Sequence, residues 1–209
     1  MNSKRGAKNA PKNERFFTAK NIAYFAMLLA LVIVLQLWGG SIKIGVTQLS
    51  FVLVPIVLCG MILGPVAGCL LGVIFGVIVY LQGLFGVDPF TGILISDHPV
   101  ITALTCLLKG GAAGLVSGVL YNLFKNKDGL AASFIAAAAA PVVNTGLFIV
   151  GALCMSDTLS ANFVDGTTVI YFLVIVCAGV NFLVELAINL IFAPAIFKLT
   201  QIIEKYIKR

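Results

Sequence analysis

The sequence predicts an all-α integral membrane protein with six transmembrane helices and both termini in the cytoplasm. Of its 209 residues, 60% are hydrophobic and 11% are charged, whereas a soluble domain carries about 25% charged residues. The mean hydropathy is +1.09. Six apolar segments, bounded by Gly, Pro and Asp, have about the length of a membrane-crossing helix, although the second is short and contains Pro55. They are 17–38, 49–63, 65–86, 99–124, 131–155 and 168–193.

The apolar pattern divides the chain into three regions. These are a basic cytoplasmic tail at 1–16, the six-helix transmembrane domain at 17–193, and an amphipathic basic cytoplasmic tail at 194–209. The first apolar run continues to Leu37, longer than the apolar core of a signal peptide, so we expect it to be retained as a helix. The last region fits either a helix lying on the inner membrane surface or a simple extension of the sixth helix.

The positions of Lys and Arg predict the orientation, because cytoplasmic segments carry an excess of both. One side would hold the N-terminal tail, the loop after the fourth segment and the C-terminal tail. Its basic residues are Lys4, Arg5, Lys8, Lys12, Arg15, Lys20, Lys125, Lys127, Lys198, Lys205, Lys208 and Arg209. The opposite side has Lys43 together with several Asp. Both termini are therefore expected in the cytoplasm.

Several classes of function are disfavoured by composition and motifs. The net charge of +6 comes from flanking segments and not from a folded basic face, which argues against nucleic-acid binding. The sequence contains no GxxxxGK[ST] phosphate loop and no HExxH metal motif, and its five cysteines form no CxxC pair. We therefore expect no enzymatic activity, no cofactor and no metal.

Small residues form two kinds of stripe. Glycines recur every four residues at 60–76 and again at 110–118, a spacing that lets helix backbones approach closely, and tight internal packing is the favoured interpretation. Ala19, Ala23, Ala26 and Ala30 share one face of the first helix. That face could dock internally or against another subunit, and the residues alone slightly favour internal docking.

Four polar residues within the apolar segments are the candidate site. Lys109 lies roughly 15 Å into the fourth segment, where a lysine is costly and suggests function. Asn144 and Asn181 reach a similar depth, and Glu185 lies one turn further along the same helical face as Asn181. The four residues could line a cavity for a polar solute, or Lys109 and Glu185 could form a purely structural ion pair. The two interpretations can also combine.

The loop after the first helix is expected to cover the mouth of this cavity. In "GGSIKIGVTQLSF", apolar residues alternate with polar or small ones, as in an extended lid. Gln48 and Tyr80 are placed near this mouth and are the remaining candidate substrate-binding residues, although an ordinary loop is an equally good explanation for each.

The chain resembles the S components of energy-coupling factor (ECF) transporters over about residues 20–200. The resemblance rests on "AMLLA" in the first helix, "LSFVLVPIVLCGMILGPVAGCLLGVIFG" across the second and third, "PVVNTGLF" in the fifth and "NFLVELAINL" in the sixth. It implies that Ala26 and Ala30 dock against a membrane T component and that two ATPase subunits supply the energy. It also implies that the last three helices bind a vitamin beneath the loop after the first helix.

The resemblance leaves the vitamin open. Pantothenate is the first choice, because a membrane lysine suits its carboxylate, and riboflavin is the second. The segment "VTQLSFVLVP" lacks the acidic residue that riboflavin-type members are expected to carry. The alternative function is a ligand-free membrane scaffold or assembly protein that contains a structural Lys109–Glu185 pair.

Overall fold

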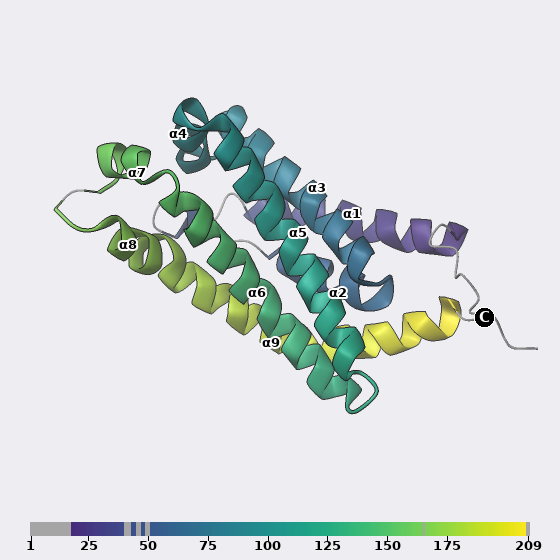
Figure 1. Ribbon diagram of the computed structural model, residues 1–209. Coiled ribbons are helices and arrows are strands. Elements are labelled where there is room, and N and C mark those ends of the chain that lie inside the picture. Colours follow the sequence, from purple (N-terminus) through teal and green to yellow (C-terminus); the bar gives the residue numbers. More distant parts are fainter. Residues whose placement is uncertain (1–17, 40–42, 45–46, 49–50, 165, 208–209) are drawn as a thin grey trace, which may run out of the picture.

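Helices form nearly all of the described chain in the computed structural model, as the composition predicts. The structure describes residues 18–39, 43–44, 47–48, 51–164 and 166–207. In chain order its elements are α1 (Ala19–Gly39), β1 (Lys43–Ile44), β2 (Thr47–Gln48), α2 (Leu53–Ile62), α3 (Pro65–Leu84), α4 (Pro89–Asp97), α5 (Pro99–Phe124), α6 (Gly129–Leu153), α7 (Ser156–Asn162), α8 (Val169–Tyr171), the π-helical η1 (Phe172–Gly179) and α9 (Val180–Ile207) (Figure 1). The strands β1 and β2 pair antiparallel in the segment where the sequence predicts an extended lid.

Five helical stretches of the described chain are long and apolar enough to cross a membrane. They are α1, α3, α5, α6 and a run over Val169–Ile203 that joins α8, η1 and most of α9. The predicted count of six is not confirmed, because the segment 49–63 contains only the ten-residue α2. About 20 residues are needed to cross the hydrocarbon core. Gly64 adopts a φ of 98° and Pro65 begins α3, so a turn limits α2 on this side.

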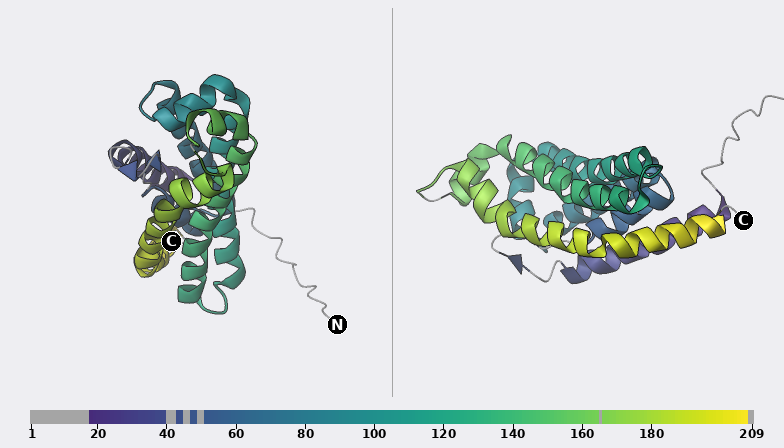
Figure 2. Two further views of the ribbon diagram at one scale, coloured as in Figure 1. Left: turned by 90° about the vertical axis from the view of Figure 1, so that its left-hand side faces the viewer. Right: turned by 90° about the horizontal axis from the view of Figure 1, so that it is seen from below.

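The bundle has two distinct ends (Figures 1 and 2). At the terminal end, the Lys20 ammonium at the start of α1 donates a hydrogen bond to the Tyr206 carbonyl near the end of α9, at 3.1 Å. The α5–α6 turn lies toward this end, whereas α4 and α7 lie at the opposite end, here named the cap end. The helix α9 continues through Pro194 to Ile207, so the described part of the C-terminal tail extends the preceding helix. The side of the membrane on which each end lies stays a prediction.

The glycine stripes form the closest helix–helix contact of the bundle, between α3 and α5. A Cβ atom added at Gly72 would overlap the backbone of Gly110, and one added at Gly114 would overlap the carbonyl of Gly68. The stripe also includes Gly60 in α2, where an added Cβ would meet the Gly114 carbonyl oxygen at 2.9 Å. These glycines therefore allow α2, α3 and α5 to pack tightly inside the protein.

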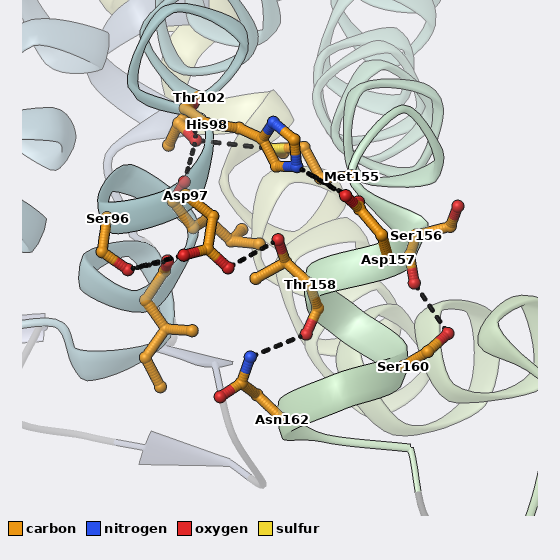
Figure 3. A network of polar contacts seen from close by, with 12 residues as sticks. Ser96, Asp97, His98, Thr102, Met155, Ser156, Asp157, Thr158, Ser160 and Asn162 are labelled. Carbon is orange, nitrogen blue, oxygen red and sulfur yellow. Dashed lines mark hydrogen bonds and ion pairs between the residues drawn. The ribbon is translucent and has the colours of Figure 1, made fainter.

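A polar network fastens the cap end (Figure 3). His98, between α4 and α5, places Nε2 3.1 Å from the Asp157 carboxylate of α7. Beside it, the Thr158 hydroxyl donates to Asp97 Oδ2 at 2.9 Å. Buried apolar side chains from α4, α6, α7 and η1 pack nearby: Phe90, Leu94, Ala152, Met155, Leu159, Phe172, Leu173 and Cys177. The helices α4 and α7, which the sequence did not predict, are thus held together at the end of the bundle.

Substitution of Gly72 by alanine is expected to destabilise the protein, by about 1–3 kcal/mol as for overpacked cores. The added methyl group meets backbone atoms of Gly110, which cannot move as a flexible side chain would. Thermal unfolding in one detergent measures the effect. The matched control is Gly146→Ala in α6, where the Cβ would meet nothing within 4 Å and where alanine gains up to about 1 kcal/mol of helix propensity. Equal melting temperatures for the two variants would contradict the packing role.

The contact between α7 and His98 is expected to weaken in acid. The pKa of Asp157 lies below its ordinary value because the Thr158 amide and the His98 ring donate hydrogen bonds to the carboxylate. Such a carboxylate stabilises the fold above its unfolded pKa, about 3.9, and this stabilisation is lost as pH falls through the lower folded pKa. The difference in melting temperature between wild type and Asp157→Asn should therefore be small but positive at pH 5 and should vanish as pH falls below the folded pKa of Asp157. A difference that stays constant with pH would refute this assignment.

Candidate functional site

A cavity of about 90 Å³ lies inside the bundle. Its wall is contributed by α1, α3, α4, α5, α6, η1 and α9, and by the junction between α3 and α4. The lining residues are Gln36, Phe75, Val79, Asp88, Phe90, Thr91, Lys109, Asn144, Thr145, Phe148, Cys177, Ala178, Asn181, Phe182 and Glu185. Four phenyl rings, two aliphatic side chains and the Cys177 thiol thus share the wall with eight polar or charged side chains. This lining is more polar than that of most small-molecule sites.

The structure brings four of the six predicted substrate-binding residues to this cavity. Lys109 comes from α5, Asn144 from α6, and Asn181 and Glu185 from α9. Asn144, Asn181 and Glu185 are between 6% and 8% exposed, and Lys109 is half-buried. Their role as binding residues remains a prediction, but the geometry needed for that role is present.

The polar stripe of α9 faces the protein interior. Asn181 and Glu185 line the cavity, and Asn189, one turn further along, is 1% exposed. The Nδ2 group of Asn181 donates to the Cys177 carbonyl at 3.3 Å, and that of Asn189 donates to the Glu185 carbonyl at 2.8 Å. The side-chain N–H group of each asparagine therefore bonds to the backbone carbonyl four residues earlier, which fixes the orientation of the amide.

The Lys109 ammonium lies over an aromatic ring. Its Nζ atom is 5.4 Å from the centroid of the Phe148 ring in α6, the distance of a cation–π contact. Such a contact is worth up to about 2 kcal/mol when it is shielded from water. It offsets part of the cost of placing a charge within the bundle, and it holds the ammonium at the cavity wall.

The two remaining predicted residues are not brought to the cavity wall by the described structure. Tyr80 is half-buried and packs against the apolar core. Gln48 lies on β2, where its backbone pairs with Lys43, but its side chain lies outside the described part of the structure.

Sequence reasoning missed four polar residues of the cavity wall, which are Gln36, Asp88, Thr91 and Thr145. Asp88 was assigned to a breaker between segments, and Thr91 lies in the unpredicted helix α4. Gln36 is the polar residue of an otherwise apolar run, and its Nε2 donates to Gln82 Oε1 at 2.7 Å. A lone glutamine in a membrane helix was the available signal for Gln36. No such signal marked Asp88, because a carboxylate beside a proline is common in turns.

Backbone irregularities surround the cavity. Pro141 lies inside α6, one turn before Asn144, and a proline there leaves the carbonyl of Ala137 without its helical partner. The π-helical turns of η1 end two residues before Asn181 and include Cys177 and Ala178 of the wall. Departures from α-helix geometry of this kind occur frequently at functional sites.

The arrangement suits reversible binding of a small polar molecule. It combines one ammonium, two carboxylates and several amides with four phenyl rings. Among the described residues, no group of three or more His, Cys, Asp or Glu side chains could hold a metal ion.

Comparison with known proteins agrees with this geometry. No match is found among curated proteins. Residues 20–197 match the sequence model of the family described as "ECF transporter, substrate-specific component", and this range includes every residue of the cavity wall. The chain therefore belongs to the family of substrate-specific components of ECF transporters and is a multi-pass protein of the cell membrane.

Proposed function

We propose that this chain captures a water-soluble vitamin from outside the cell and delivers it through an ATP-driven energy-coupling module. The observation that carries the proposal is the cavity, in which charged and amide side chains from α5, α6 and α9 converge inside an apolar bundle. Ionisable residues in membrane helices are costly and usually serve a substrate or ion path. The cap end would face outward, so that the Lys-rich terminal end lies in the cytoplasm.

The family implies the other components of the transporter. Members are transport subunits and not enzymes themselves, and they work with a membrane T component, ATPases and a small-molecule substrate. In the proposed division of labour, two ATPase subunits hydrolyse ATP and this chain selects the solute.

Pantothenate is the proposed solute, and riboflavin is the second choice. A carboxylate on the ligand would pair with the Lys109 ammonium, which already lies at the cavity wall against Phe148. Riboflavin lacks a carboxylate for this pairing. The amides of Asn144 and Asn181 would orient the polar part of the ligand, and the phenyl rings would cover its apolar part.

A ligand-free scaffold is the competing function. In that case Lys109 and Glu185 would serve only to hold α5 and α9 together through their opposite charges. Both side chains line the same cavity, so the two functions must be separated by their response to mutation.

Lys109→Met is expected to lower the affinity for pantothenate at least tenfold, about 1.4 kcal/mol, with little change in melting of the empty protein. The lost interaction would be the one with the ligand carboxylate. Calorimetric titration and a melting curve on the same detergent-solubilised samples measure both effects. Lys125→Met, at the C-terminal cap of the same helix, is the matched control, because Lys125 bonds to Asn122 and does not line the cavity.

The scaffold function predicts the opposite result for Lys109→Met, a large loss of stability. Breaking a buried pair would destabilise the fold by about 3–5 kcal/mol, and adding Glu185→Gln would restore stability. If Lys109→Met melts far below wild type, and the double variant both recovers and binds pantothenate as tightly as wild type, Lys109 is structural and the proposed site is wrong.

The alanine face of α1 is the proposed docking surface for the T component. Ala19, Ala23, Ala26 and Ala30 are all exposed on the isolated chain, which favours a partner over internal packing. Only 22% of the apolar stretch of α1 is buried inside the protein, the lowest share among the five candidate spans. Small residues on an exposed membrane face let a second helix approach closely.

Ala26→Trp combined with Ala30→Trp is expected to abolish vitamin uptake in cells while leaving ligand binding by the isolated chain unchanged. The two indoles block close helix approach and do not reach the cavity. Val119→Trp with Leu123→Trp is the matched control, since this pair has the same spacing and is exposed on α5. Normal uptake by the Ala26/Ala30 variant, with uptake measured from radiolabelled pantothenate, would eliminate the docking role.

A further inference from the structure

The cavity wall presents hydrogen-bond acceptors that its own donors leave unused. Asn144 Oδ1 is buried and has no hydrogen-bond partner among the described residues, and its side chain is 8% exposed. The Asp88 carboxylate, also 8% exposed, accepts a hydrogen bond from the Thr91 hydroxyl. A carboxylate can accept about four hydrogen bonds, so most of the capacity of Asp88 remains for another molecule.

Two amide donors of the wall are directed at the protein. Gln36 Nε2 donates to Gln82, and Asn181 Nδ2 donates to the Cys177 carbonyl. The charged groups also include more acceptors than donors, because the wall contains two carboxylates, those of Asp88 and Glu185, and one ammonium, that of Lys109. A ligand with only an anionic group would satisfy Lys109 but would leave Asn144 Oδ1 without a donor and would add none to the Asp88 carboxylate. A buried acceptor without a donor costs about 1–3 kcal/mol.

We propose that the cavity selects a small carboxylate that also carries hydroxyl or N–H donors, and that Asp88 is the residue that receives them. The ligand carboxylate pairs with Lys109, and its donors bond to Asp88 and to Asn144 Oδ1. This inference rests on the proposed capture of a carboxylate vitamin and adds a second point of recognition to it. Asp88 thereby becomes the specificity-determining residue.

The position of Asp88 is fixed by its surroundings. Its backbone N–H donates to the Gln82 carbonyl at 3.1 Å, and Gln82 in turn accepts from Gln36 across the bundle. Thr91, one turn into α4, orients the carboxylate. At the other end of α4, Asp97 is fastened to Thr158 of α7. The carboxylate is therefore preorganised, which reduces the entropy lost when a ligand binds.

Three probes test the proposal on the full chain in detergent. They are pantothenate, its analogue in which both hydroxyls are replaced by hydrogen, and an analogue in which the terminal hydroxyl is replaced by an amine. Each is titrated calorimetrically into wild type, Asp88→Asn and Asp128→Asn. The last variant is the matched control, since Asp128 is, like Asp88, the N-cap carboxylate of a helix, but it caps α6 and does not line the cavity.

Wild type and Asp128→Asn are expected to bind pantothenate at least tenfold more tightly than the analogue without hydroxyls. Asp88→Asn should reduce this ratio to threefold or less, mainly by weakening pantothenate. If the amine analogue binds wild type more tightly than pantothenate and loses that advantage in Asp88→Asn, the preferred donor is an ammonium group. If it binds less tightly, the preferred donor is a hydroxyl.

Equal binding of all three probes to wild type, or a ratio that survives in Asp88→Asn, would overturn the proposal and would mean that water satisfies these acceptors. Failure of every probe to bind wild type would instead reject the capture of such carboxylates, and this inference with it. If Asp88→Asn does not fold, Thr91→Val serves in its place. It keeps the carboxylate but removes the hydroxyl that orients it, and an unchanged ratio there would also count against the proposal.

Discussion

The backbone contact between α3 and α5 is the constraint on which the rest of the structure depends. Gly72 and Gly110 leave no room for a Cβ atom on either side, so the rotation of α5 about its own axis is set by this contact. Successive residues of a helix are about 100° apart. With Gly110 against α3, the preceding residue Lys109 is turned away from that contact and toward α6, where it meets the Phe148 ring. The same rotation of α5 therefore places Gly110 against α3 and the Lys109 ammonium beside Phe148 of α6.

Lipid offers no hydrogen bonds, so each polar group in the bundle must be satisfied by protein, by water or by a ligand. The structure satisfies most of them locally. Hydroxyls such as those of Thr105, Ser117 and Ser133 donate to carbonyls one turn earlier in their own helices. Two of the groups that differ lie at the cavity, where Asn144 Oδ1 lacks a partner among the described residues and Asp88 has spare capacity. A third, Asn189 Oδ1, lacks a partner among the described residues but does not line the cavity. The cavity thus contains polar groups that a bound solute could satisfy.

The sequence predicted the long helices because apolar length and glycine spacing are local properties, and it predicted the four-residue cluster because equal depth along three helices implies proximity. It could not predict that Asp88 joins the cluster. That placement depends on α4, a nine-residue helix whose stability comes from its contacts with α7 and not from its own pattern. The count of six crossing helices also rested on length, and the turn at Gly64 and Pro65 leaves α2 at only ten residues.

The helix α1 connects the two surfaces that a transport subunit needs. It is the least buried of the candidate spans, and its alanine face is open on the isolated chain. Yet Gln36, six residues beyond Ala30 and therefore about 9 Å along the helix, lies in the cavity wall. Six residues correspond to about 600° of rotation, which directs Gln36 and Ala30 to different sides of α1. A partner that tilted α1 at its alanine face would therefore displace Gln36 and strain its bond to Gln82. Because the backbone carbonyl of Gln82 also accepts the N–H of Asp88, that strain would pass to Asp88 in the cavity wall.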